Sequence, residues 1–173
     1  GLSSGISAIY FATVGVIALI VGKIGMDFVL SFIMLGAVLG FLVHNFHPAT
    51  IFAGDSGSLF MGFMIAVIAL LGFKSVTLTS LLIPILILAI PILDTLFAIL
   101  RRTLKGESIS TPDKSHLHHQ FLNKNFSHRA TVLIIYAINI LFAFASTVRT
   151  ENNIKDNITK IGKKAFFEFK SLI

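Results

Sequence analysis

The chain contains no cysteine and no tryptophan, and it carries little charge. Without cysteine it can form neither a disulfide nor a thiolate metal site. Without tryptophan, an aromatic belt at a membrane interface would rest on Tyr10, Tyr136 and neighbouring phenylalanines. Charged residues make up 13% of the chain and hydrophobic residues 55%, and the mean hydropathy is +0.89. Because a soluble globule needs more polar surface than this, the composition predicts an integral membrane protein.

Long apolar runs predict an all-α polytopic transmembrane helical bundle with about five spans. The runs are residues 6–22, 28–43, 59–73, 79–100 and 130–147. The run 59–73 is short and contains glycine, so a broken or tilted helix and an extension into Lys74 are both left open. The chain is accordingly divided into a membrane-embedded domain, 1–147, and a basic tail, 148–173. The spacing of apolar residues in the tail suits an amphipathic helix lying in the head groups.

Five spans place the two longer polar loops, 44–58 and 101–129, on one face. The second loop holds six basic residues: Arg101, Arg102, Lys105, Lys114, Lys124 and Arg129. By the positive-inside rule this face is cytoplasmic, which predicts a multi-pass protein of the cell membrane. The tail would then emerge outside although it is basic, in conflict with the same rule. The net charge of +6 favours anionic head groups or substrates, and the chain has no aromatic-basic RNA motif, so no nucleic-acid partner is expected.

Asp55 stands in the string Gly54-Asp55-Ser56-Gly57-Ser58, directly before an apolar run. One interpretation is that Asp55 caps the N-terminus of the following helix. The other is that it is a Mg²⁺ ligand beside a phosphate-binding loop, and the two are compatible. The GDSG string also occurs in chymotrypsin-like proteases, but that interpretation requires a soluble β-barrel and is disfavoured here.

Asp94 lies inside an apolar run, two turns before Arg101 and Arg102. A charge at that depth is costly unless it is paired or hydrated, so Asp94 is a candidate site residue, with a structural ion pair to Arg101 as the alternative. Pro84 and Pro91 predict a kink that opens a crevice near Asp94.

Three histidines crowd into the segment 113–119, beside Lys114. They are His116, His118 and His119. Such a cluster offers hydrogen-bond donors and proton transfer to an anionic substrate. The alternatives are a cluster that merely hydrates the loop and a chance metal-binding tract, although zinc is disfavoured without thiolates. The other histidines are interpreted as interfacial: His44, His47 and His128.

Three strings, HPATIFAGDSGSLFMG, PILDTLFAILRR and STPDKSHLHHQFL, occur in this order. Together they resemble the C-terminal half of the bacterial polyprenyl-phosphate N-acetylhexosamine-1-phosphate transferases, especially the member that starts wall teichoic acid synthesis. The resemblance covers residues 1–147. Family members carry an Asp-Asp pair and an Asn-rich motif ending in Asp-Gly-Leu before this part, so we expect the chain to be a fragment.

The resemblance implies an enzyme of cell-wall polymer biosynthesis. It would transfer N-acetylhexosamine 1-phosphate, with GlcNAc favoured, from a UDP-sugar to polyprenyl phosphate and release UMP. Mg²⁺, or alternatively Mn²⁺, would assist on the cytoplasmic face, with Asp55 as a ligand. The resemblance further implies that His116, His118 and His119 bind or polarise the diphosphate. Asp94, Arg101 and Arg102 would shape the nucleotide-sugar pocket.

A second interpretation from another class is kept beside the enzyme. The chain could be a non-catalytic membrane protein or remnant, or one half of a split enzyme. A homodimer and an association with a separately encoded N-terminal half are both left open. The sugar and the lipid chain length are not fixed by the sequence.

Overall fold

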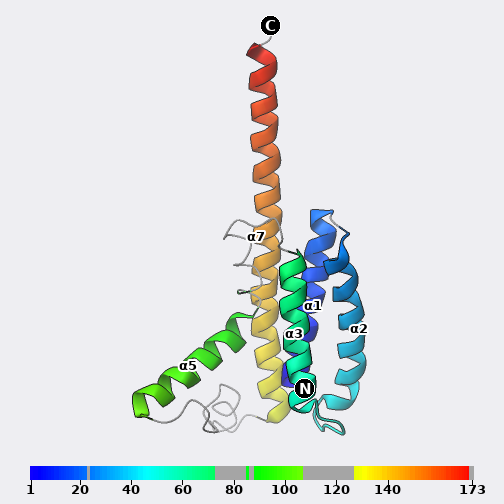
Figure 1. Ribbon diagram of the computed structural model, residues 1–173, viewed down its shortest axis with the longest axis vertical. Helices are drawn as coiled ribbons and strands as arrows, with labels where there is room; N and C mark the ends of the chain where they lie inside the picture. Colours follow the sequence, from blue (N-terminus) through cyan, green and yellow to red (C-terminus); the bar gives the residue numbers. More distant parts are fainter. Residues whose placement is uncertain (23, 73–84, 86–87, 107–126, 172–173) are drawn as a thin grey trace.

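A computed structural model describes the chain except residues 23, 73–84, 86–87, 107–126 and 172–173 (Figure 1). The described part is helical and contains no β-strand, which confirms the all-α prediction. Its helices are α1 (Leu2–Val21), α2 (Met26–Asn45), α3 (Gly54–Gly72), α5 (Ala89–Lys105) and α7 (His128–Ser171).

Four of these helices are long and apolar enough to cross a membrane: α1, α2, α3 and the His128–Asn157 part of α7. They correspond to four of the predicted spans. The span predicted at 59–73 corresponds to one unbroken helix, α3. This helix begins earlier than predicted, at Gly54, because its polar first turn is also helical.

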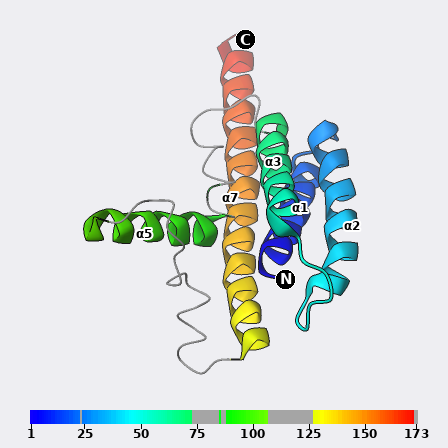
Figure 2. The same cartoon turned by 60° about the horizontal axis from the view of Figure 1, so that its bottom comes forward.

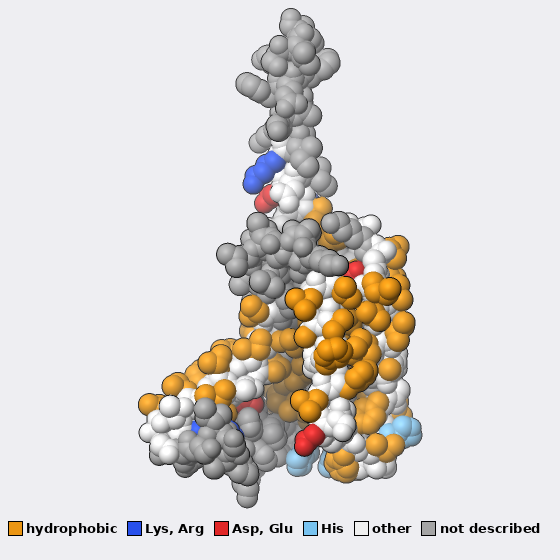
Figure 3. All heavy atoms as spheres, viewed as in Figure 1, with side chains coloured by type: hydrophobic (Ala, Val, Ile, Leu, Met, Phe, Trp, Pro, Cys, Tyr) orange, Lys and Arg blue, Asp and Glu red, His pale blue; other side chains and the backbone are white. Residues whose placement is uncertain are grey.

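Helix α1 is the centre of the bundle and packs against α2, α3 and α7. In the most apolar 18-residue stretch of α1, 61% of the residues are buried. In the corresponding stretches of α2, α3 and α7 the buried share is 17%, 11% and 28%. The core side chains come mainly from α1, with contributions from α2 and α3: Tyr10, Phe11, Val14, Ile17, Met34, Val38, Met61 and Ile68. The outer faces carry exposed apolar side chains, as lipid-facing helices do (Figure 3).

Close approach of α1 and α7 depends on Gly5. A Cβ atom at this position would overlap the phenol of Tyr136 on α7. The Tyr136 hydroxyl donates a hydrogen bond to the carbonyl oxygen of Gly1. The absence of a side chain at Gly5 therefore lets Tyr136 fasten the beginning of α1 to α7.

Of the predicted span 79–100, the structure describes residues 85 and 88–100. Leu88 is a turn residue there, and α5 begins at Ala89 and continues to Lys105. Figures 1 and 2 show α5 crossing α7 at a steep angle instead of running parallel to it. Pro91 lies in the first turn of α5, where a missing N–H costs no helical hydrogen bond, so the proline marks a helix start and not a kink.

Helix α7 is the longest element, with 44 residues. At 1.5 Å per residue it is about 66 Å long, more than twice the thickness of a bilayer core. Residues 148–171 continue the same helix beyond the bundle (Figure 1). The tail is therefore helical, as predicted, and continuous with α7, and its position in the head groups stays a prediction.

One end of the bundle gathers the polar connections. Gly1, the loop 46–53, the start of α3 and the start of α7 lie together there, and α5 descends toward it (Figure 1). We call it the polar end. The described parts of the two long polar loops thus share one side, as predicted.

Candidate functional site

The loop 46–53 folds back on the last turn of α2. The backbone oxygen of His44 accepts hydrogen bonds from the Thr50 N–H at 2.9 Å, the Thr50 hydroxyl at 3.1 Å and the Ile51 N–H at 3.3 Å. These bonds satisfy a carbonyl that the helix end would leave without a partner. The loop, which contains a cis His47–Pro48 peptide bond, is thereby held in one shape next to α3.

Asn45 joins this loop to α1. Its side chain is buried, its Nδ2 donates to the Ile51 oxygen at 2.8 Å, and its Oδ1 accepts from the Ser4 hydroxyl at 2.7 Å. Buried amides in proteins are expected to be satisfied in this way. The sequence analysis did not single out Asn45, because a lone amide at the end of an apolar run resembles any helix boundary.

Asp55 lies in the first turn of α3 and not before it. Gly54, the first residue of the helix, has φ of 61°, a left-handed value that favours glycine. The Ser58 hydroxyl donates to the Gly54 oxygen at 2.9 Å and the Asp55 oxygen at 3.1 Å. The Asp55 side chain is exposed at the end of the helix where the dipole favours negative charge. The N-cap interpretation is therefore replaced by an exposed first-turn carboxylate.

A cavity of about 850 Å³ lies at the polar end. Its walls come from the starts of α1, α3 and α7 and from the loop, including Ser3, Asn45, Gly54, Ser58 and Thr131. Asp55 stands one residue from the Gly54 wall. Acidic and histidine side chains lie near one another at this end (Figure 3).

Two histidines meet at this cavity. His47 from the loop and His128 from the first turn of α7 stack with ring centroids 5.4 Å apart and an interplanar angle of 7°. The Nε of Arg129 donates to the His47 oxygen at 3.2 Å. The sequence analysis interpreted both histidines as separate interfacial residues, because 81 positions separate them in the chain.

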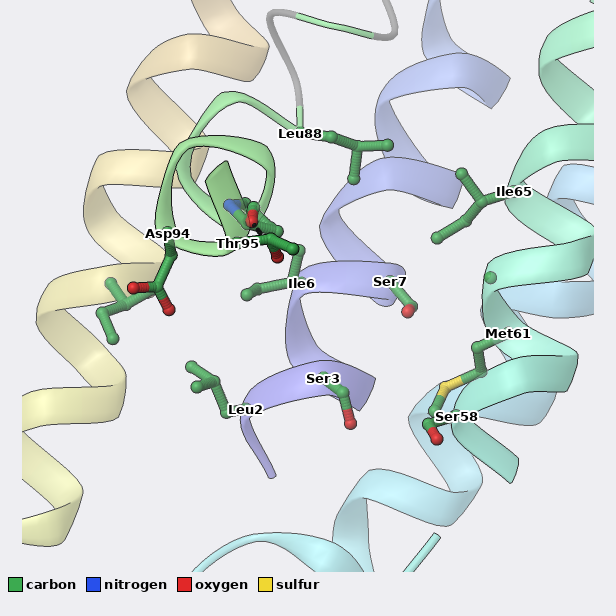
Figure 4. A pocket seen from close by; sticks show the side chains of 13 residues that line it. Leu2, Ser3, Ile6, Ser7, Ser58, Met61, Ile65, Leu88, Asp94 and Thr95 are labelled. Atoms are coloured by element: carbon green, nitrogen blue, oxygen red, sulfur yellow. Dashed lines mark hydrogen bonds between the residues drawn. The ribbon is translucent and has the colours of Figure 1, made fainter. Parts of the chain in front are cut away.

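A second cavity, of about 410 Å³, lies between α1, α3, α5 and α7 (Figure 4). Its lining is mainly apolar, with hydroxyls from Ser3, Ser7 and Ser58 on one side and Asp94 on the α5 side. This is the crevice that was predicted near Asp94. It shares Leu2, Ser3 and Ser58 with the larger cavity, so the two adjoin.

Asp94, Arg101 and Arg102 lie on one face of α5. Their spacing of seven and eight residues returns to the same side of a helix, and all three side chains are half-buried. The opposite face carries exposed apolar side chains: Leu93, Leu96, Phe97, Leu100 and Leu104. Asp94 thus lines the second cavity, whereas Arg101 and Arg102 lie further along α5, which leads away from α7 (Figures 1 and 2).

The histidine cluster predicted at His116, His118 and His119 lies outside the described residues. Within the described part, no three histidine, aspartate or glutamate side chains come together to hold a metal ion. Mg²⁺ commonly uses one or two carboxylates together with waters and substrate phosphates. The described residues therefore suit Mg²⁺ bound through Asp55 with substrate and water, and not a site of described protein ligands alone.

Comparison with known proteins finds that this chain is similar to parts of polyprenyl-phosphate N-acetylglucosamine phosphotransferases. Residues 1–73 match the model of Glycosyl transferase family 4. The chain is 50% identical over 149 residues to a probable undecaprenyl-phosphate N-acetylglucosaminyl 1-phosphate transferase of Bacillus subtilis. The aligned residues make up 86% of this chain and 41% of the relative. It is 40% identical over 140 residues to a decaprenyl-phosphate N-acetylglucosaminephosphotransferase of Mycobacterium tuberculosis, covering 74% of this chain and 35% of the relative.

A more distant relative is the phospho-N-acetylmuramoyl-pentapeptide-transferase of Moorella thermoacetica, 35% identical over 148 residues, or 84% of this chain and 44% of the relative. The chain spans less than half the length of these relatives. No solved structure matches it significantly. The resemblance predicted from the three strings is confirmed.

Proposed function

Because the chain is 50% identical over 149 residues to part of a probable undecaprenyl-phosphate N-acetylglucosaminyl 1-phosphate transferase, we propose that it carries out the same class of reaction. The protein transfers N-acetylglucosamine 1-phosphate from UDP-GlcNAc to a polyprenyl phosphate and releases UMP. The identity to a phospho-N-acetylmuramoyl-pentapeptide-transferase is lower, at 35%, so GlcNAc is better supported than a muramoyl sugar as the transferred group. The proposed role is a step in cell-wall polymer synthesis, such as that of teichoic acid.

The transfer exchanges one phosphorus–oxygen bond for another. A phosphate oxygen of the lipid attacks the β-phosphorus of UDP-GlcNAc, and the bond from that phosphorus to the bridging oxygen breaks. UMP leaves with the bridging oxygen. Such a reaction depends on positioning and charge neutralisation more than on covalent catalysis by the protein.

The two adjoining cavities suit the two reactants. The cavity of about 850 Å³ has the polar side chains of Ser3, Asn45, His47, His128 and Thr131 within a mainly apolar lining, and the exposed ring of Phe52 there offers a stacking surface for a nucleotide base. The second cavity is mainly apolar and continues into a groove of about 380 Å³ along α5, lined by Leu88, Pro91, Leu96 and Ile99. An isoprenoid chain has the apolar surface to occupy that groove.

Charged and histidine side chains have distinct roles in this proposal. Asp55 provides a carboxylate for Mg²⁺, or for Mn²⁺ in its place, and the metal neutralises phosphate charge when bound. His116, His118 and His119 bind the diphosphate. Arg101 and Arg102 attract the anionic reactants, and Asp94 shapes the pocket. The polar end is proposed to face the cytoplasm, where UDP-GlcNAc is available.

A transfer assay tests the proposal. Membranes that contain the protein receive undecaprenyl phosphate, Mg²⁺ and UDP-GlcNAc labelled in the sugar, and the labelled lipid and the UMP are measured. We expect both products with the wild type and background levels with Asp55→Asn. UDP-GalNAc and UDP-MurNAc-pentapeptide serve as competing donors. Background levels from the wild type would favour a non-catalytic membrane protein, and equal product from the wild type and Asp55→Asn would contradict the role of Asp55.

A further inference from the structure

His47, His128 and Arg129 form a cluster that no role in the proposed reaction yet uses. All three side chains are exposed at the polar end, and they come from two segments that are far apart in the sequence. The parallel imidazoles stand 5.4 Å apart, and Arg129 reaches the His47 backbone oxygen at 3.2 Å. His47 and His128 both line the larger cavity.

Arg129 gives this cluster a positive charge. No carboxylate of the described part forms an ion pair with any of the three side chains, and Glu151 and Lys155, which pair with each other, lie beyond the bundle on α7. The contact with His47 occupies one of the five N–H donors of the Arg129 guanidinium. Stacking between two exposed imidazoles, His47 and His128, stabilises such a pair only weakly.

The arrangement suits an oxyanion at the edges of the two rings. Imidazole N–H groups lie in the ring plane, so two stacked rings with centroids 5.4 Å apart present their donors side by side at their edges. One tetrahedral anion placed there can accept a hydrogen bond from each ring and a further bond from the guanidinium, which recognises phosphate well. A bound anion would also offset repulsion between protonated imidazoles.

We propose that His47, His128 and Arg129 form a phosphate-binding site at the larger cavity, separate from Asp55 and the histidines of the segment 113–119. It rests on the proposed function, because the phosphate is that of a reactant or product. Two sources supply the same chemistry: the phosphate of a uridine nucleotide, and the head group of a polyprenyl phosphate. Since the site lines the larger cavity together with the exposed ring of Phe52, and not the groove along α5, the nucleotide phosphate is the favoured source.

Binding measurements with purified protein in nanodiscs test this site. One arm titrates UMP into nanodiscs of neutral lipid, and the other varies undecaprenyl phosphate in the nanodisc without nucleotide. We expect Arg129→Ala and His128→Gln each to weaken UMP binding about tenfold, the loss of one charge-assisted hydrogen bond. Arg129→Lys should retain part of the affinity, because a point charge remains. The undecaprenyl phosphate arm should be unchanged.

His44→Gln is the matched control. His44 is an exposed histidine of the same end, but it lines neither cavity, and we expect wild-type affinity. Thermal unfolding of each variant reports whether the fold is intact, and Arg129→Lys covers the case in which Arg129→Ala fails to fold. If both Arg129→Ala and His128→Gln bind UMP as the wild type does, the site is refuted. A loss confined to the lipid arm would refute the nucleotide source.

Failure of the proposed function gives a different pattern. If the protein transfers no sugar phosphate yet binds UMP in a manner that depends on Arg129, the phosphate site stands and the transferase proposal falls. If transfer is normal and UMP affinity is unchanged in the variants, the transferase proposal stands and the phosphate site falls.

Discussion

At the scale of single residues, the polar end combines an exposed carboxylate with a buried amide. Asp55 faces water at the start of α3, where it can meet a substrate, whereas Asn45 is enclosed and links three chain segments. The loop 46–53 separates the two residues, and Asn45 lines the larger cavity next to which Asp55 stands. Chemistry and scaffolding are thus assigned to different side chains, and each can be tested alone.

Replacing Asp55 tests the chemistry. Asp55→Asn keeps the size of the side chain but removes the charge that would neutralise a metal ion at the phosphates. For the transfer reaction we expect a loss of about 10²-fold or more in rate. The measurement is the initial rate of UMP release at saturating UDP-GlcNAc. A neighbouring control, Ser56→Ala, should remain close to the wild type, and a near-normal rate for Asp55→Asn would contradict the assignment.

Replacing Asn45 tests the scaffold. Asn45→Ala leaves the Ser4 hydroxyl and the Ile51 carbonyl without the partners they have now. We expect the free energy of unfolding to fall by about 1–3 kcal/mol, the cost of unsatisfied buried polar groups. Thermal unfolding in detergent measures this. Asn152→Ala, at an exposed position of α7, is the control and should unfold as the wild type does.

At the scale of helices, the bundle is organised around α1, and its closest contact with α7 passes through Gly5. Tyr136 occupies the space that a side chain at Gly5 would need. The same tyrosine bonds the Gly1 carbonyl next to both cavities. The spacing of α1 and α7 therefore determines the shape of the candidate site.

A methyl group at Gly5 should separate these helices. Gly5→Ala forces Tyr136 to move and breaks its bond to Gly1, and overpacking of this kind costs about 1–3 kcal/mol. Gly36→Ala on α2 is the matched control, because an added Cβ there meets no atom within 4 Å. Thermal unfolding should show a lower midpoint for Gly5→Ala alone. Equal midpoints for the two variants would argue against the contact.

Hydropathy predicted α1, α2, α3 and α7 well because lipid-facing helices are apolar over their whole length. It failed for α5, since the apolar run 79–100 conceals a change at Leu88, after which apolar and polar residues alternate with helical period. The three motif strings identified the resemblance and Asp55. Asn45 and the pairing of His47 with His128 could not be predicted, because they depend on contacts between distant segments.

At the scale of the whole molecule, the helices sort the polar connections to one end and send α7 past the other (Figure 1). This arrangement gives the protein a defined orientation in the bilayer. The polar end carries the larger cavity, Asp55 and Arg129 at the start of α7, whereas Arg149, Lys155 and Lys160 lie further along α7, beyond the bundle. The positive-inside rule predicts that it faces the cytoplasm.

Cysteine labelling in intact cells tests this orientation. The chain has no cysteine, so single replacements give no background. We expect Ser56→Cys and Ser127→Cys to be protected from a membrane-impermeant maleimide and Asn153→Cys to be labelled. Permeabilised cells provide the control, in which all three should react. Labelling of only one of Ser56→Cys and Ser127→Cys in intact cells would overturn the shared face.

The wall that both cavities share has a kinetic consequence. Leu2, Ser3 and Ser58 stand between the cavity proposed for the nucleotide and the cavity proposed for the lipid, so for the proposed reaction neither reactant has to change phase before they meet. The concentration of a donor dissolved in water is expressed per volume of solution, whereas the concentration of an acceptor dissolved in the membrane is expressed per area of bilayer. Diluting the bilayer with inert phospholipid at constant total acceptor should therefore slow the enzyme, while adding buffer at constant donor concentration should not.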